Sequence, residues 1–128
     1  MQEKYLELQM IDQQIKQLQE QLQSIDIKLL ELDTLKQALK DMPSVKEKSE
    51  ILAPLSNGIF IKAKVQKTDK LLINIGNNII VEKTLKESQN LLNEKFSEIE
   101  SLRNGNIAEI ENLIRKAQEI EKSFKKNV

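Results

Sequence analysis

The first third of the chain places an apolar residue at alternating steps of three and four positions. Gln, Glu, Lys and Asp fill the positions between, so the apolar residues form one narrow stripe along a helix. The stripe continues for more than four heptads, which is typical of a coiled coil. We predict a helix from about residue 2 to residue 42 that ends before Pro43, because proline lacks the backbone donor and disfavours helix at the preceding residue. The predicted seam residues are Leu8, Ile11, Ile15, Leu18, Leu22, Ile25, Leu29 and Leu32.

The last third repeats this design with a polar interruption. Arg103 and Asn106 occupy positions on the stripe, and the segment 104–106 (Asn-Gly-Asn) has low helix propensity. We predict one long helix from about residue 84 to residue 126 with a weak or shifted register in this segment. A genuine break at Gly105 is the alternative that stays open. The predicted seam residues are Leu92, Phe96, Ile99, Ile110, Leu113 and Ile120.

Between the two helices the apolar period changes from about 3.5 to 2, which predicts β-strands. Asn57-Gly58 predicts a type I′ turn, because both central positions of that turn need a positive φ. Residues 76–78 (Gly-Asn-Asn) predict a second tight turn. Four strands in two hairpins result, about 50–55 with 58–66 and 71–75 with 78–83. The apolar strand residues are Leu52, Ile59, Ile61, Val65, Leu71, Ile73, Ile75, Ile79 and Val81.

These elements predict a mostly α fold, in which a long antiparallel coiled-coil hairpin carries two small β-hairpins between its helices. We expect one domain, made of an N-terminal coil helix (1–42), a β insert (43–83) and a C-terminal coil helix (84–128). The insert is apolar on both faces and too small to bury that surface alone. Its strand edges also carry unpaired backbone groups that invite other strands. We therefore interpret the insert as an assembly module.

The composition supports a thin seam and excludes several functions. Of 128 residues 39% are hydrophobic and only 3% aromatic, and the 20 basic residues balance the 20 acidic ones, so no positive excess favours nucleic acid. The chain has no Cys and no His, and none of its three glycines lies in a phosphate-binding pattern. We expect no enzymatic activity, cofactor or metal. No long apolar run or signal peptide is evident, which predicts a cytoplasmic protein without a membrane span.

Two segments carry a resemblance to a known family. Residues 51–63 (ILAPLSNGIFIKA) and residues 71–84 (LLINIGNNIIVEKT) resemble the two hairpins of archaeal prefoldin alpha subunits. The flanking heptads have the matching order and length, and two hairpins favour the alpha class over the beta class. The resemblance implies an intersubunit β-barrel within a hexamer of two alpha and four beta subunits. It further implies ATP-independent capture of unfolded client polypeptides at the coil tips and their delivery to a group II chaperonin.

The chain termini concentrate apolar residues beyond those of the seam. Given the resemblance, we expect these residues to contact client polypeptides; the plainer alternative is that they only cap the coil. Two other functions stay open: a structural or filament-forming relative of prefoldin alpha, and a transcription-elongation factor of the coiled-coil finger type. The sequence argues against the latter, because the β insert occupies the place of its acidic tip. The predicted client-binding residues are Met1, Tyr5, Leu6, Met10, Ile120 and Phe124.

Overall fold

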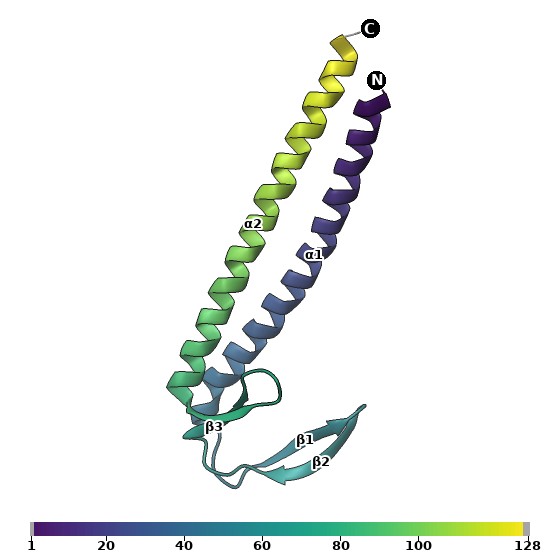
Figure 1. The fold of residues 1–128 in the computed structure, drawn as a ribbon. Helices are drawn as coiled ribbons and strands as arrows, with labels where there is room; N and C mark the ends of the chain where they lie inside the picture. The colour runs from purple at the N-terminus through teal and green to yellow at the C-terminus, as the bar shows by residue number, and fades with distance from the viewer. Residues whose placement is uncertain (1, 127–128) are drawn as a thin grey trace. The chain divides into compact units, whose positions relative to one another are not determined.

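The computed structural model describes residues 2–126 and contains two long helices with two β-hairpins between them in sequence (Figure 1). The helices are α1 (Gln2–Asp41) and α2 (Leu85–Lys126), and a short 3₁₀ helix, η1 (Met42–Ser44), follows α1 at Pro43. The strands are β1 (Glu50–Ser56), β2 (Ile59–Lys64), β3 (Lys70–Asn74) and β4 (Ile80–Thr84). The predicted helices, the stop at Pro43 and the two hairpins are confirmed.

The chain divides into two compact units. Of the described residues, the first unit, which we call the terminal coil, contains residues 2–31 and 96–126, and the second, the central unit, contains residues 32–95. Within the terminal coil α1 and α2 run antiparallel, with the start of α1 beside the end of α2 (Figure 1).

The seam between the helices is one side chain thick. Each predicted seam residue is buried or half-buried. Ile11, Ile25 and Leu113 in the terminal coil and Leu32 in the central unit are the buried apolar side chains of the described residues. The other seam residues keep partial exposure, because a two-helix coil has no second layer to cover them. Burial of each such Leu or Ile contributes about 1.5–3 kcal/mol, less where exposure remains.

The helix α2 continues without a break through Gly105, so the alternative of a break at this position is wrong. Asn106 turns inward and is buried, and its Nδ2 donates to the carbonyl oxygen of Leu18 at 3.5 Å. The Nε of Arg103 donates to Oδ1 of Asp26 at 2.6 Å. The helix therefore accommodates the polar positions by pairing them across the seam.

The central unit holds two separate two-stranded sheets, β1 with β2 and β3 with β4, both antiparallel. Asn57 (φ 45°) and Gly58 (φ 79°) both have positive φ, which confirms the predicted type I′ turn. In the second hairpin Asn77 and Asn78 adopt φ values of 51° and 59°. Turn geometry of this kind sets the strand register.

A capping box joins β4 to α2. The backbone N–H of Thr84 donates to Oε1 of Glu87 at 3.0 Å, and the backbone N–H of Glu87 donates to Oγ1 of Thr84 at 3.1 Å. The hydroxyl of Ser88, which is 2% exposed, donates to the carbonyl oxygen of Thr84 at 2.8 Å. These bonds satisfy backbone groups that a helix start leaves without partners. This motif was not predicted from the sequence, although Thr-x-x-Glu before an apolar run is its signature.

Candidate functional site

The end of the terminal coil presents an apolar surface, which we call the tip surface and define as Tyr5, Leu6, Met10, Ile120 and Phe124. Tyr5 and Leu6 are each 60% exposed and Met10 is 62% exposed. The seam of α1 uses Leu8 and Ile11. A helix of 3.6 residues per turn directs Leu6 and Met10 away from that seam, whereas Tyr5 lies at its edge. Ile120 and Phe124 are half-buried. The predicted client-binding residue Met1 lies outside the described residues.

An aromatic pair joins the two helices at the tip surface. The rings of Tyr5 and Phe124 stack with centroids 4.9 Å apart and an interplanar angle of 27°. The Nζ of Lys4 lies 5.9 Å from the centroid of Phe124 and donates a hydrogen bond to Oγ of Ser123 at 3.0 Å. Aromatic stacking and a cation over a ring are each favourable. Lys4 and Ser123 were not among the predicted site residues, although Lys4 precedes Leu8 by one helical turn and so belongs to the seam stripe.

The first hairpin exposes apolar side chains on both of its faces. Opposite residues of antiparallel strands share a face, so Ala53 and Ile61 lie on one face and Pro54 and Phe60 on the other. A bulge between Pro54 and Ser56 shifts the register before the turn. The exposed large apolar side chains of this hairpin are Ile51, Leu52, Leu55, Ile59, Phe60 and Ile61.

The second hairpin differs, because only one of its faces is fully exposed. Leu71, Ile73 and Val81 share a face and are half-buried. The opposite face carries Leu72 and Ile80, which are 72% and 62% exposed. The second hairpin therefore leaves large apolar side chains exposed on one face.

Three of the predicted strand residues lie just outside the strands. Val65 follows β2, but its N–H donates to the carbonyl oxygen of Ser49 at 2.9 Å and so extends the ladder. Ile75 and Ile79 close the second turn through an N–H···O bond of 3.0 Å. The side chain of Asn74 ends β3 early, because its Oδ1 accepts the N–H of Gly76 at 2.9 Å.

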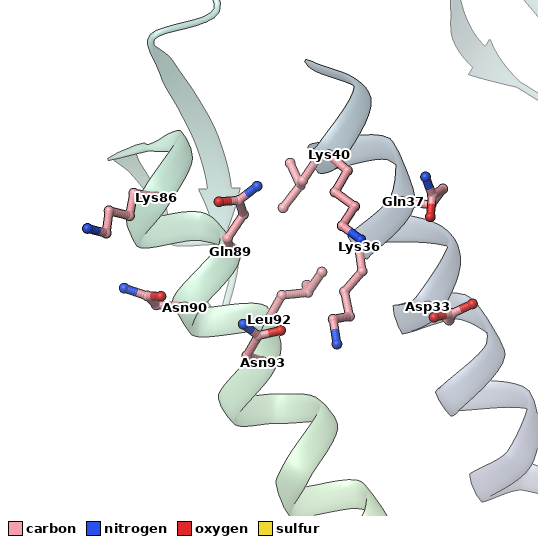
Figure 2. Close-up of a pocket in the computed structure, with 10 residues that line it drawn as sticks. Asp33, Lys36, Gln37, Lys40, Lys86, Gln89, Asn90, Leu92 and Asn93 are labelled. Atoms are coloured by element: carbon pink, nitrogen blue, oxygen red, sulfur yellow. The ribbon is translucent and has the colours of Figure 1, made fainter. Parts of the chain in front are cut away.

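A polar groove of about 420 Å³ lies between the two helices inside the central unit (Figure 2). Lys36 occupies a seam position where an apolar side chain would otherwise fill the space. Figure 2 shows Lys36 and Leu92 pointing into the space between the helices, while Lys86 points away from it. The lining residues are Asp33, Lys36, Gln37, Leu39, Lys40, Lys86, Gln89, Asn90, Leu92 and Asn93.

The described residues show few features of a metal-binding or catalytic site. No three or more His, Cys, Asp or Glu side chains among residues 2–126 are arranged to hold a metal ion. In the same part of the chain no helix has the length and apolar character needed to cross a membrane. The one titratable group with a clearly shifted pKa in this part is Glu87. Its pKa is lowered mainly by the hydrogen bond that its carboxylate accepts from the backbone N–H of Thr84, and further by the side chain of Thr84. That group belongs to the helix cap.

Two long helices, with two β-hairpins that expose apolar side chains between them in sequence, define the class of coiled-coil proteins that carry a β insert. A family model described as "Prefoldin subunit" matches residues 11–128. The chain is 31% identical over 119 residues to a prefoldin subunit alpha of Thermofilum pendens, covering 93% of this chain and 92% of that protein. It is 30% identical over 128 residues to a prefoldin subunit alpha of Methanococcus aeolicus, covering 100% of this chain and 87% of that protein. This chain belongs to the prefoldin family.

The solved structures agree with this fold. A chain in the cryo-EM structure of filamentous PFD from Methanocaldococcus jannaschii superposes with a TM-score of 0.84 at 20% identity. The match covers 93% of this chain and 98% of that chain. At this level of identity the match concerns the fold alone.

Proposed function

We propose that this chain is the alpha-class subunit of an ATP-independent chaperone, which holds unfolded polypeptides at the tip surface. The observation that carries the proposal is the exposure of Tyr5, Leu6 and Met10, each at least 60% exposed at one end of a prefoldin-type coil. An unfolded chain presents apolar segments, and their contact with exposed apolar side chains removes both surfaces from water. Met10 adds adaptability, because its unbranched side chain fits irregular partners.

Assembly through the β-hairpins is the second part of the proposal. The hairpins supply strand edges and apolar faces, and we propose that beta subunits and a second alpha subunit cover them in a hexamer of two alpha and four beta chains. Closure into an intersubunit β-barrel would pair the free edges. Such an assembly would gather several tip surfaces around one client and hand the client to a group II chaperonin. Binding at several tips raises the effective concentration of each further contact.

The tip surface is tested by replacing its exposed apolar residues. Leu6→Ser with Met10→Ser, in the complex with beta subunits, should reduce suppression of the aggregation of a chemically unfolded protein, followed by light scattering without ATP. Leu102→Ser is the matched control, because Leu102 is 58% exposed on α2 away from the tip surface. Equal suppression by the tip variant and the control would refute the tip assignment.

A deletion provides a second test of the tip surface. Removal of residues 1–10 and 118–128 should leave the number of subunits in the complex unchanged. It should abolish suppression of client aggregation. Undiminished suppression by the shortened protein would contradict the proposal.

Assembly is tested separately. Ile61→Asp with Ile73→Asp places charges on the hairpin faces and should prevent complex formation, measured by size-exclusion chromatography with light scattering. The helix content measured by circular dichroism should stay unchanged. Ile27→Asp is the control, because Ile27 is an equally apolar residue, 60% exposed on α1. A complex that persists in the double variant would argue against strand-mediated assembly.

The same chromatography distinguishes the alternative of a filament-forming relative. A subunit of the proposed complex should reach its final mass only after mixing with a beta subunit. A filament former should assemble when purified alone, and that result would replace the hetero-oligomer with a homopolymer.

A further inference from the structure

Two asparagines of the chain are followed directly by glycine, Asn57 in the turn of the first hairpin and Asn104 inside α2. Asparagine is among the thermolabile residues of proteins, because its side-chain carbonyl carbon can be attacked by the backbone nitrogen of the next residue. When that next residue is glycine, no Cβ hinders the close approach of the nitrogen. The two sites therefore share the same intrinsic chemistry, and the fold separates them.

The turn of the first hairpin leaves Asn57 and Gly58 open to water. Both residues are exposed, and a Cβ built on Gly58 meets no atom within 4 Å. Among the hydrogen bonds of residues 2–126, none involves the backbone N–H of Gly58 or the side-chain amide of Asn57. Ser56 and Ile59 pair where the turn meets the strands, so a backbone rotation at Asn57 disturbs only the last pair of the ladder.

The helix holds the same two residue types in α2. Asn104 and Gly105 are also exposed, so access of water does not distinguish this site from the turn. The N–H of Gly105, however, lies inside a continuous helix, in which each N–H donates to the carbonyl oxygen four residues earlier. Attack by this nitrogen requires the helix to open around Gly105, although the neighbouring Asn106 is buried in the seam.

We propose that Asn57 is a site of spontaneous deamidation, with water as the co-reactant. The backbone nitrogen of Gly58 loses its proton to solvent and forms a bond to Cγ of Asn57. The bond from Cγ to the amide nitrogen breaks, and the amide group takes up a proton and leaves as ammonia. The cyclic succinimide that results then adds one water molecule. Opening at the former side-chain carbonyl gives aspartate, and opening at the main-chain carbonyl gives isoaspartate.

Isoaspartate changes the turn on which the first hairpin depends. Its main chain runs through the former side chain and is longer by a methylene group, so the two-residue type I′ turn is lost. Turn geometry sets the strand register, and the register decides which apolar side chains of β1 and β2 share a face. Deamidation therefore withdraws unassembled chains from complex formation, whereas cover of the hairpin by other subunits protects assembled chains. This consequence rests on the proposed function, because it concerns assembly through the hairpins.

Peptide mapping by mass spectrometry tests the modification site. The full chain is incubated in neutral buffer and then digested, and the mass change from amide to carboxylate is followed at both Asn-Gly sequences. The change at Asn57 should be at least about tenfold faster than at Asn104, because a turn opens more often than a helix interior. In a chain that is digested first and incubated afterwards, the two sequences should react at similar rates. Equal rates in the folded chain, or no change at Asn57, would overturn the proposal.

Two substitutions at Asn57 test the consequence for assembly. Asn57→Gly has no amide to lose and gives Gly-Gly, which also favours a type I′ turn. Asn57→Asp carries the charge of the product on an ordinary main chain, and Asp-Gly favours the same turn. Each protein is mixed with a beta subunit, and the mass of the complex is measured by size-exclusion chromatography with light scattering. The incubated parent should lose assembly in proportion to its isoaspartate content, whereas incubated Asn57→Gly and fresh Asn57→Asp should assemble like the fresh parent.

Each outcome of the assembly test has a distinct meaning. Full assembly of parent chains that contain isoaspartate, or an equal loss in incubated Asn57→Gly, would overturn the link between deamidation and assembly. Deamidation of Asn57 should be several-fold slower in the complex than in the free chain, and equal rates would overturn protection by assembly. If the fresh parent does not assemble with a beta subunit, the proposed assembly itself fails, while peptide mapping still decides the modification site.

Discussion

The capping box at Thr84 and Glu87 holds the start of α2 through two reciprocal hydrogen bonds, one of which is accepted by a charged carboxylate. Thr84→Ala removes the Oγ1 that accepts the N–H of Glu87 at 3.1 Å and leaves that donor to water. Glu87→Gln keeps an acceptor for the N–H of Thr84 but removes the charge. The two variants therefore separate the hydrogen bond from the electrostatics at the start of α2.

The expected loss of stability in Thr84→Ala follows from the position of Thr84 at the start of α2. Replacing an N-cap threonine by alanine typically destabilises a helix by about 0.5–2 kcal/mol. Thr84 is exposed, so water replaces part of the lost bond and we expect about 1 kcal/mol. Glu87→Gln should cost less than Thr84→Ala, because glutamine also serves in capping boxes.

The pH dependence has a defined sign. The pKa of Glu87 lies below the ordinary value of 4.5, because its carboxylate accepts a hydrogen bond from the backbone N–H of Thr84. The side chain of Thr84 lowers this pKa further. A lowered pKa in the folded state stabilises the fold above the unfolded pKa, and this contribution is lost as the pH falls through the folded pKa. Between pH 7 and about pH 5 the contribution is therefore constant, and it declines below about 4.5. In Glu87→Gln this part of the decline should be absent.

Urea unfolding followed by circular dichroism measures the global effect, and hydrogen exchange of amides 85–88 measures the local one. Thr84→Ala should lower the urea midpoint and raise exchange in this first turn of α2. Ser97→Ala, on the exposed side of the same helix, should do neither. First-turn exchange that is unchanged in Thr84→Ala, or an acid decline that is identical in Glu87→Gln and the parent, would refute this account of the junction.

Two further predictions use matched pairs of substitutions, measured as free energies of unfolding by urea denaturation. Leu113→Ala should cost at least about 2 kcal/mol, because the side chain is 8% exposed, whereas Leu102→Ala at 58% exposure should change stability by less than about 0.5 kcal/mol; equal losses would contradict the single seam. Gly58→Ala should cost about 1–2 kcal/mol, because Gly58 has φ 79°, while Gly105→Ala inside α2 should stabilise by up to about 1 kcal/mol. If both glycine variants changed the free energy of unfolding in the same direction, the result would argue against the positive φ at Gly58 or against a continuous helix through Gly105.

Much of the fold could be predicted because its signals are local. The stripe from Leu8 to Leu32 predicts α1, and Pro43 marks its end, which the structure places at Asp41. Asn57-Gly58 predicts a turn whose two positive φ values follow from the chemistry of these two residues. The capping box could have been predicted in the same way, because Thr84 and Glu87 have the spacing of its signature. The extension of all these parts into one domain of residues 1–128 stays a prediction.

The polar segment of α2 shows that helix propensity alone does not predict whether a helix is interrupted. Asn104-Gly105-Asn106 disfavours helix, yet the helix continues, because the apolar seam on both sides of this segment holds it in register. Propensity alone could not decide between a weak register and a break, since each costs only a small free energy compared with the burial of the flanking seam residues.

By itself the sequence determined the helices, the turns and the seam positions, because periodicity and turn chemistry act over a few neighbouring residues. Only the tertiary structure decided which residues meet across the seam. The stacking of Tyr5 on Phe124 and the pairing of Asp26 with Arg103 depend on the register of two helices far apart in sequence. Likewise, half-burial of Leu71, Ile73 and Val81 on one face of the second hairpin depends on packing within the central unit, which no alternation of apolar residues can specify.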